Sequence, residues 1–444
     1  MKAAQRRDYL VKQSATDNDQ QILDRAWQHE KKHRGHDQKG KAPAVALPTV
    51  SVATARELIA QTSKYRSIPA HLRNRIGISR FKKPIIKFLT KAFGIWTRIS
   101  TSYAHQMGWY PSVKPYVGYG TEQFSRLICR TVFAPRHVNP HKPVRGIRAM
   151  LDVAAPYECV RIDIDGTPLR TVQIGEIERF ERNDPQRART SDYAISDQAG
   201  YLDLLAEHPL TPGIHTMKCH VPHRAPVSAE LFTISEHCPV GIISDVDDTI
   251  MVTQVPTIWR AAYNMLLSNP RKRASVPGMA VMYNKLQRMF PQAPFFYLST
   301  SPWNVESQIR GFITDYGFPD GPMLLRDLDP RPKTFVPSGV NHKLEYVDQL
   351  MDDFPQMRFI LLGDDGQQDP TTYATIARRY PGRVLAIGIR QLSVREASGG
   401  LPVAMRRGMA VTQPIPDTEV PVFTGTTGAN LMKTMLPYLQ QFAD

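Results

Sequence analysis

From residue 240 onward, short apolar segments alternate with segments of helical pattern. Six apolar runs have the character of buried strands: VGIISD, FFYLS, PMLLRD, RFILLGDD, RVLAIGI and VPVFTG. Segments such as PGMAVMYNKLQRMF and NVESQIRGFITDYG lie between several of them and have the spacing of helices. This alternation predicts an α/β fold, a parallel sheet with helices on both faces. Because ligands bind such sheets beyond the carboxyl ends of the strands, polar residues at those ends are candidate site residues.

The motif Asp-x-Asp-x-Thr occurs twice, and the two copies lie in different surroundings. In RIDIDGTPLR (161–170), polar and apolar residues alternate, which predicts a strand with one buried and one solvated face. Asp163 and Asp165 then share the polar face, and Asp165 with Gly166 forms a hairpin turn. The first copy is therefore interpreted as part of a β-hairpin.

The second copy, GIISDVDDTI (241–250), follows a continuous apolar run, as expected for a central parallel strand. Asp245 and Asp247 come where that strand should end, and both carboxylates can face one site if the backbone stays extended. Other polar residues follow later strands or open a helix, and they join the candidate site: Ser299, Lys343, Asp364 and Asp369.

The region before residue 240 has a different pattern. Between 120 and 236, short β-rich segments follow one another with turn residues between them, which predicts a small antiparallel β-sandwich. We therefore expect four parts: a disordered basic tail over 1–50, a basic helical arm over 51–112, a β-sandwich over 113–238 and the α/β domain over 239–444.

The positive charge of the chain is concentrated at its N-terminal end. The whole chain has 56 Lys and Arg against 41 Asp and Glu, and residues 1–110 hold 21 of the former and 7 of the latter. Within PIIKFLTKAFGIWTRI, apolar residues recur at helical spacing and basic residues share the other side. Such a helix either lies on an anionic membrane surface or packs on the protein's own core. No base-reading motif is present, so nucleic acid is the less favoured partner.

The cysteines and the N-terminus bear on localisation. The four cysteines lack the spacing of a zinc site or a disulfide framework. The N-terminal segment has no apolar core of a signal peptide, and no apolar run is long enough to cross a bilayer. We expect a cytoplasmic protein that can touch a membrane peripherally.

The polar strand ends resemble the four motifs of the haloacid dehalogenase superfamily of phosphohydrolases. The matching stretches are GIISDVDDTI, FFYLSTSPWN, the NHK of 341–343 and GDDGQQD. The wider range 114–395 resembles the phosphatidate phosphatase family related to the yeast actin-patch enzyme, a distant cousin of the lipins. One departure is NVES (304–307), where that family leads us to expect an aromatic residue, and it bears on substrate contacts.

The resemblance implies a role for each matching residue. Asp245 is expected as the nucleophile that forms an aspartyl-phosphate, and Asp247 as the general acid and base. Ser299 is expected to bind a phosphate oxygen and Lys343 to offset charge. A Mg²⁺ ion is expected on Asp245, Asp364 and the backbone carbonyl of Asp247.

The supporting ligand of that ion is either Asp369 or Asp365, and the sequence does not decide between them. Asp248 and Thr249 are expected to brace the loop. The basic residues of NPRKRASVPG (269–278) either meet an anionic headgroup or form a solvated loop. GTTG (425–428) is expected to be a strand-to-helix turn rather than a phosphate loop.

Three functions are compatible with these residues. The favoured one is a Mg²⁺-dependent enzyme that hydrolyses phosphatidate to diacylglycerol and phosphate. A second keeps the chemistry but acts on a soluble phosphomonoester or a phosphoprotein. The third is a non-catalytic phosphatidate sensor, against which the presence of both Asp245 and Asp247 argues. The sequence does not indicate an oligomeric state.

Overall fold

The computed structural model describes residues 95, 99–134, 152–174, 193–196, 199–252, 273–326, 342–366, 368–393, 396, 416 and 418–443. The expected tail over 1–50 and most of the expected arm over 51–112, including its basic residues, lie outside these ranges. Within the described part of the chain, no helix is both long and apolar enough to span a bilayer.

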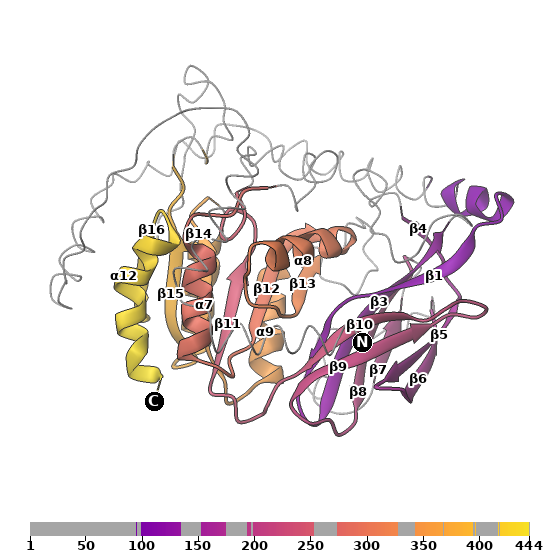
Figure 1. The fold of residues 1–444 in the computed structure, drawn as a ribbon, viewed down its shortest axis with the longest axis horizontal. Helices are drawn as coiled ribbons and strands as arrows, with labels where there is room; N and C mark the ends of the chain where they lie inside the picture. The colour runs from indigo at the N-terminus through magenta and orange to yellow at the C-terminus, as the bar shows by residue number, and fades with distance from the viewer. Residues whose placement is uncertain are drawn as a thin grey trace, which may run out of the picture.

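The second half of the chain builds a six-stranded sheet, here called sheet B, in which every pair of neighbours is parallel. Its strands lie in the order β13-β12-β11-β14-β15-β16 (Figure 1). Their bounds are β11 Val240–Asp245, β12 Phe295–Pro302, β13 Met323–Arg326, β14 Arg358–Asp364, β15 Val384–Arg390 and β16 Val422–Gly425. The α/β class predicted from the alternation is confirmed.

Helices cover both faces of sheet B, as a parallel sheet requires. Residues of three helices pack in one apolar cluster with one face of the strands, and residues of two others pack in a second cluster with the other face. The first three are α7 Met279–Met289, α8 Glu306–Asp315 and α12 Gly428–Leu439. The other two are α9 His342–Asp353 and α10 Asp369–Arg379.

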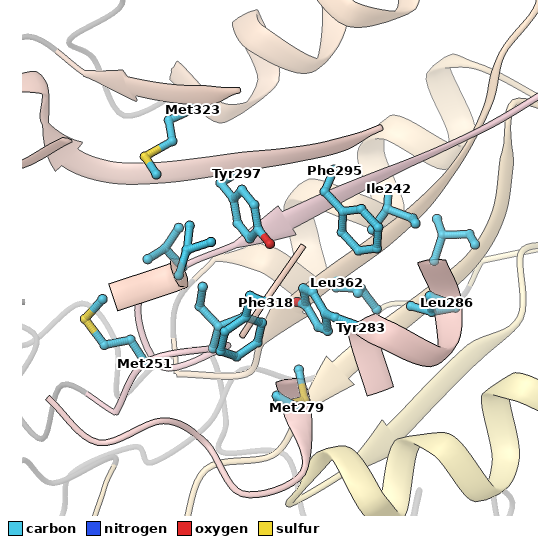
Figure 2. Packing of buried hydrophobic residues seen from close by; sticks show 14 of the residues in the cluster. Ile242, Met251, Met279, Tyr283, Leu286, Phe295, Tyr297, Phe318, Met323 and Leu362 are labelled. Carbon is cyan, nitrogen blue, oxygen red and sulfur yellow. The ribbon is translucent and has the colours of Figure 1, made fainter. Parts of the chain in front are cut away.

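Tyr283 of α7 anchors the first of these clusters beneath the middle of the sheet (Figure 2). Its ring stacks on Phe295 with centroids 5.7 Å apart and meets Phe318 edge-on at 5.3 Å. Its hydroxyl shares a 2.6 Å hydrogen bond with the hydroxyl of Ser244 on β11. A buried tyrosine hydroxyl needs such a partner, so α7 is tied to the strand that ends at the candidate site.

The first half of the chain builds a ten-stranded sheet, here called sheet A. Its main order is β6-β5-β9-β10-β2-β3-β8-β7, with β1 and β4 also paired to β3. The bounds are β1 Tyr110–Pro115, β2 Gly118–Gly120, β3 Phe124–Ala134, β4 Val153–Ala154, β5 Cys159–Ile164, β6 Thr167–Gln173, β7 Tyr193–Ser196, β8 Tyr201–Glu207, β9 Gly213–His220 and β10 Val227–Thr233. The expected antiparallel pairing is wrong for one pair, β10 with β2, which is parallel. A long connection separates these two strands, so no hairpin forces them to be antiparallel.

The first Asp-x-Asp-x-Thr copy is the hairpin that the alternation predicts, between β5 and β6. Asp165 and Gly166 both have positive φ, 49° and 86°, as a two-residue hairpin turn requires. The expectation that Asp163 faces water is wrong, because ion pairs with Arg161 and His220 allow it to be buried. Both carboxylates of this copy thus have structural partners within sheet A.

Sheet A packs beside sheet B through residues of β2 and β3. Arg126 makes two hydrogen bonds to Asp353 at the end of α9, at 3.1 and 3.2 Å. The hydroxyl of Tyr119 donates a third to the same carboxylate, at 2.8 Å. The Arg126 and Asp353 side chains are about nine-tenths buried, so this carboxylate joins the two sheets in a region largely shielded from water.

Replacement of Asp353 should therefore destabilise the whole chain. Asp353→Ala removes two charge-assisted hydrogen bonds from the buried guanidinium of Arg126, and we expect a loss of about 3 kcal/mol in the free energy of unfolding. Urea denaturation followed by tryptophan fluorescence measures this loss.

Asp348→Ala is the matched control, because Asp348 lies on the same helix in a more exposed ion pair with Arg379. It should cost about 1 kcal/mol or less. Equal losses in the two variants would contradict the importance of the Asp353 contact.

Candidate active site

The central strand β11 delivers Asp245 to the carboxyl edge of sheet B. Both of its neighbours are parallel to it, and all six of its residues are buried. Asp245 is the last of them and is 1% exposed. Its Oδ2 accepts a hydrogen bond from the hydroxyl of Thr249 at 3.1 Å, so the loop after the strand fixes the orientation of the carboxylate.

Asp364 and Asp369 lie beside Asp245. Asp364 ends the adjacent strand β14, and Asp369 begins α10 directly after it. One carboxylate oxygen from each of the three lies within 4.8 Å of the others. Gly363 permits this arrangement, because a Cβ atom there would come within 2.5 Å of Oδ2 of Asp369.

Lys343 provides the positive charge among these acids. Its Nζ lies 2.6 Å from Oδ1 of Asp245 and 2.5 Å from Oδ1 of Asp369. It is the second residue of α9, the helix on the opposite side of β11 from α7. The sequence therefore placed Lys343 correctly at the opening of a helix.

The charges in this cluster shift one another's pKa values. Burial raises the pKa of Asp245 to about 7, although Lys343 opposes the shift. Burial, with the charges of Asp369 and Asp245, raises the pKa of Asp364 well above its ordinary value. Burial opposes the charge of Lys343, but its two carboxylate partners outweigh that and raise its pKa.

The carboxylates fit a hard divalent cation. Oδ2 of Asp364 is buried and has no hydrogen-bond partner in the described part of the chain, while Oδ1 accepts from the amide of Gly366 at 2.7 Å. An unpaired buried oxygen is costly unless a proton or a cation satisfies it. Three carboxylates offer the hard oxygen ligands that Mg²⁺ takes in proteins. Asp245, Asp364 and Asp369 are thus the residues that could hold such an ion.

Asp247 lies outside this group of three and has its own set of donors. Its Oδ2 accepts hydrogen bonds from the hydroxyls of Ser299 and Ser301, both at 3.0 Å. Its Oδ1 accepts from the guanidinium of Arg273 at 3.2 Å. These three donors fix the orientation of the Asp247 carboxylate.

Of the two acids between which the sequence left the choice open, Asp369 lies in the three-carboxylate group. The carboxylate of Asp365 accepts a hydrogen bond from the amide of Leu392 at 2.8 Å and is not part of the three-carboxylate group. Burial raises the pKa of Asp365 to about 6, against that hydrogen bond and the charge of Arg390. Arg390 also donates to the backbone carbonyl of Asp248. Asp365 and Asp248 therefore both take part in contacts between the loops around the site.

Sequence reasoning missed two residues that contact Asp247. Ser301 lies two residues beyond Ser299 on the same strand, and the period of a strand could have indicated that both side chains share a face. Arg273 comes from the segment expected to meet a headgroup or solvent, and no local pattern points it at Asp247. Its neighbours Arg271 and Lys272 lie outside the described residues.

Two further expectations concern loops near the site. At the departure NVES, Glu306 pairs with Arg310 one helical turn later at 2.7 Å, so the position of the missing aromatic residue carries an ion pair. In GTTG, Thr427 caps α12 through its hydroxyl, which accepts from the amide of Asn430. That segment is a strand-to-helix turn, as expected.

Comparison with known proteins finds a family model that matches part of this chain. Residues 240–391 match the model described as "Phosphatidate phosphatase APP1, catalytic domain". The chain is 31% identical to phosphatidate phosphatase APP1 of Saccharomyces cerevisiae over 206 residues, which cover 45% of this chain and 35% of that protein. It is 25% identical to an uncharacterized protein of Schizosaccharomyces pombe over 197 residues, 42% of this chain and 32% of the other.

These matches span about a third of each relative's length. Among solved structures, tandem Ig repeats of Dlar align with 31% of this chain and 60% of theirs, at 11% identity and a TM-score of 0.16, a likeness from which nothing follows. The matched residues 240–391 contain Asp245, Asp247, Ser299, Lys343, Asp364 and Asp369. Over residues 240–391, this chain is therefore similar to the catalytic domain of the phosphatidate phosphatase APP1 family.

Proposed function

We propose that this protein is a Mg²⁺-dependent phosphatidate phosphatase that works through an aspartyl-phosphate on Asp245. The observation that carries the proposal is the buried cluster of Asp245, Asp364 and Asp369 around Lys343, at the carboxyl end of a sheet that matches the APP1 catalytic domain. The name of the yeast relative supports phosphatidate as the substrate. The assignment to the wider haloacid dehalogenase superfamily belongs to the same proposal.

The chemistry follows from the positions of two carboxylates. An oxygen of Asp245 attacks phosphorus, the bond to the ester oxygen breaks, and Asp247 in its protonated form gives that oxygen a proton. Water then attacks the phosphorus of the aspartyl-phosphate while Asp247 takes a proton from it. Inorganic phosphate leaves, and the carboxylate of Asp245 is restored.

The neighbouring side chains manage charge during both steps. Lys343 lowers the cost of an ionised Asp245 in a buried position, and its ammonium also offsets charge on the phosphoryl group. The hydroxyl of Ser299 turns from Asp247 to a phosphate oxygen. Asp245, Asp364, Asp369 and the backbone carbonyl of Asp247 are the proposed Mg²⁺ ligands, and the bound ion supplies the positive charge that lets two anions approach.

A soluble phosphomonoester or a phosphoprotein is the second candidate substrate, because the same residues would act on any accessible phosphomonoester. The sensor alternative is less favoured, since Asp247 has a full set of donors beside a nucleophile and a cation site. We further propose peripheral contact with an anionic membrane, on the strength of the basic segment over 51–100, which has 11 basic and 1 acidic side chains.

The substrate assignment is tested by phosphate release from phosphatidate vesicles, compared with glycerol 3-phosphate and a phosphopeptide. We expect release from the vesicles with Mg²⁺ and none above background with EDTA, because the clustered carboxylates need the cation. Turnover of only the soluble esters would contradict phosphatidate as the substrate.

Replacement of the nucleophile should stop turnover. Asp245→Asn removes the attacking oxygen anion but keeps the shape of the side chain, so we expect kcat to fall by at least about 10³-fold. Asp165→Asn, in the other Asp-x-Asp-x-Thr copy, is the matched control and should keep the wild-type rate. Steady-state phosphate release and circular dichroism of all three proteins provide the measurement. A rate for Asp245→Asn within tenfold of wild type would rule out its role.

Removal of the metal should reveal how much the clustered carboxylates destabilise the folded protein. The pKa of Asp364 is raised in the folded protein above its ordinary value of 3.8, so the folded state holds a proton that the unfolded chain has lost. Stability of the metal-free protein therefore falls as pH rises from about 4 towards the folded pKa. Asp364→Asn cannot ionise, and it should melt higher than wild type in EDTA at pH 8, with a smaller gain at pH 5.

Thermal melts at both pH values, with EDTA or with Mg²⁺, measure these differences. Mg²⁺ should raise the melting temperature of wild type more than that of Asp364→Asn. Equal stabilisation of both proteins by Mg²⁺, or a lower melting temperature for the variant at pH 8 in EDTA, would show that Asp364 does not face the cation.

A further inference from the structure

A small recess opens beside Asp247. Three polar residues line it, Asp247, Arg273 and Ser301, and none of the three clustered carboxylates does. The rest of its lining is apolar: Met251, Pro302, Val305 and Ile309. The recess therefore lies beside the proposed general acid and outside the three-carboxylate group.

The substrate's leaving oxygen has to lie within hydrogen-bonding distance of Asp247 when the proton is transferred. The alcohol attached to that oxygen must then lie against the residues around Asp247. Apolar walls suit an alcohol with an apolar body, and the guanidinium of Arg273 suits an acceptor oxygen close to the ester. An acylated glycerol has both features.

One wall of the recess is formed where β12 passes into α8. The short helix η3, Trp303–Val305, makes this connection. Pro302 and Val305 face the recess, whereas the two residues between them contact sheet A. The ring of Trp303 lies 4.6 Å from that of Tyr116, and Oδ1 of Asn304 accepts a hydrogen bond from Nη1 of Arg130 at 3.0 Å.

Arg130 is itself held firmly by sheet A. Its Nε donates to the carbonyl of Ala199 at 3.0 Å, and its guanidinium lies 4.7 Å from the centroid of the Tyr201 ring. Only 7% of the residue is exposed. A planar group fixed at two points presents its remaining donors in one direction, so Asn304 is set in place by sheet A.

We propose that this recess receives the part of the substrate's alcohol nearest the leaving oxygen and that Arg130 is a positioning residue for its wall. The inference rests on the proposed phosphatase function and adds a specificity site that sheet A helps to shape. It assigns sheet A a part in substrate selection, although all the proposed reacting groups belong to the other half of the chain.

Arg126 provides a matched control for Arg130. The two arginines lie four residues apart on β3, so they share a face of the strand. Arg126 contacts Asp353, which follows Lys343 by ten residues on α9, about 15 Å away along the helix axis. Loss of Arg126 weakens the contact between the sheets far from the recess. Loss of Arg130 removes the hydrogen bond that holds Asn304 in the wall of the recess.

The test compares Arg130→Gln with Arg126→Gln in the full chain, using dispersed dioctanoyl phosphatidate and glycerol 3-phosphate. We expect Arg130→Gln to lower kcat/KM for dioctanoyl phosphatidate on the order of tenfold, mainly through KM, and to change glycerol 3-phosphate less. Arg126→Gln should lower the melting temperature and leave the ratio of the two kcat/KM values unchanged.

A second pair of variants probes the wall directly. Ile309 lines the recess, and Ile313, one turn later on α8, is equally buried but does not line it. Ile309→Ala should lower the preference for dioctanoyl phosphatidate by roughly tenfold, and Ile313→Ala should not change it. Both variants lose a similar packing contribution, so a stability effect alone cannot produce the difference.

The outcomes separate the two proposals. If the wild-type protein hydrolyses neither ester with Mg²⁺, the proposed function is wrong. The wild-type protein can instead be active while Arg130→Gln, Ile309→Ala and the two controls all keep the wild-type ratio of the two kcat/KM values. That result would contradict both the role of the recess in substrate binding and the role of Arg130. A ratio shifted equally by Arg126→Gln and Arg130→Gln would also overturn it, because the effect would then follow stability rather than position.

Discussion

The candidate site depends on the ion pairs of Lys343 with Asp245 and Asp369. Three carboxylates buried together repel one another and are held from water. Burial, with the charges of Asp369 and Asp247, raises the pKa of Asp245 to about 7 although Lys343 opposes the shift. The ammonium of Lys343 is the group that keeps a negative charge tolerable there. Because Lys343 belongs to α9 and its partners to β11 and α10, the charge balance also fixes how these elements pack around the carboxyl edge of sheet B.

Much of this site could be predicted from the sequence because parallel strands bring their carboxyl ends to one edge. Asp245 and Asp364 each end a strand of the sheet, and the structure places them side by side. The same reasoning separated the two Asp-x-Asp-x-Thr copies, since a period of two signals a hairpin and a continuous apolar run signals a central strand. The local sequence pattern was sufficient to predict a residue's position wherever the order and direction of the strands determine that position.

The contacts that cross between elements were not predictable. Arg273 reaches Asp247, and Arg130 reaches Asn304 across 174 residues, with no spacing or composition to indicate either. The burial of Asp163 depends on His220 of another strand, and so the alternation along β5 gave the wrong exposure. Such contacts are set by how the two sheets and their loops pack. In the proposed function, these contacts shape the recess for the substrate's alcohol, whereas the strand ends supply the reacting groups.

Transient phosphorylation of Asp245 is the central claim, and chemical trapping tests it most directly. Wild-type protein mixed with phosphatidate and Mg²⁺ is quenched in acid within one turnover and reduced with borohydride, which converts an aspartyl-phosphate to homoserine. Peptide mass spectrometry should then find homoserine at position 245 only when both phosphatidate and Mg²⁺ were present. Turnover of phosphatidate with Asp245 unmodified, or homoserine at a different aspartate such as Asp364, would contradict the account.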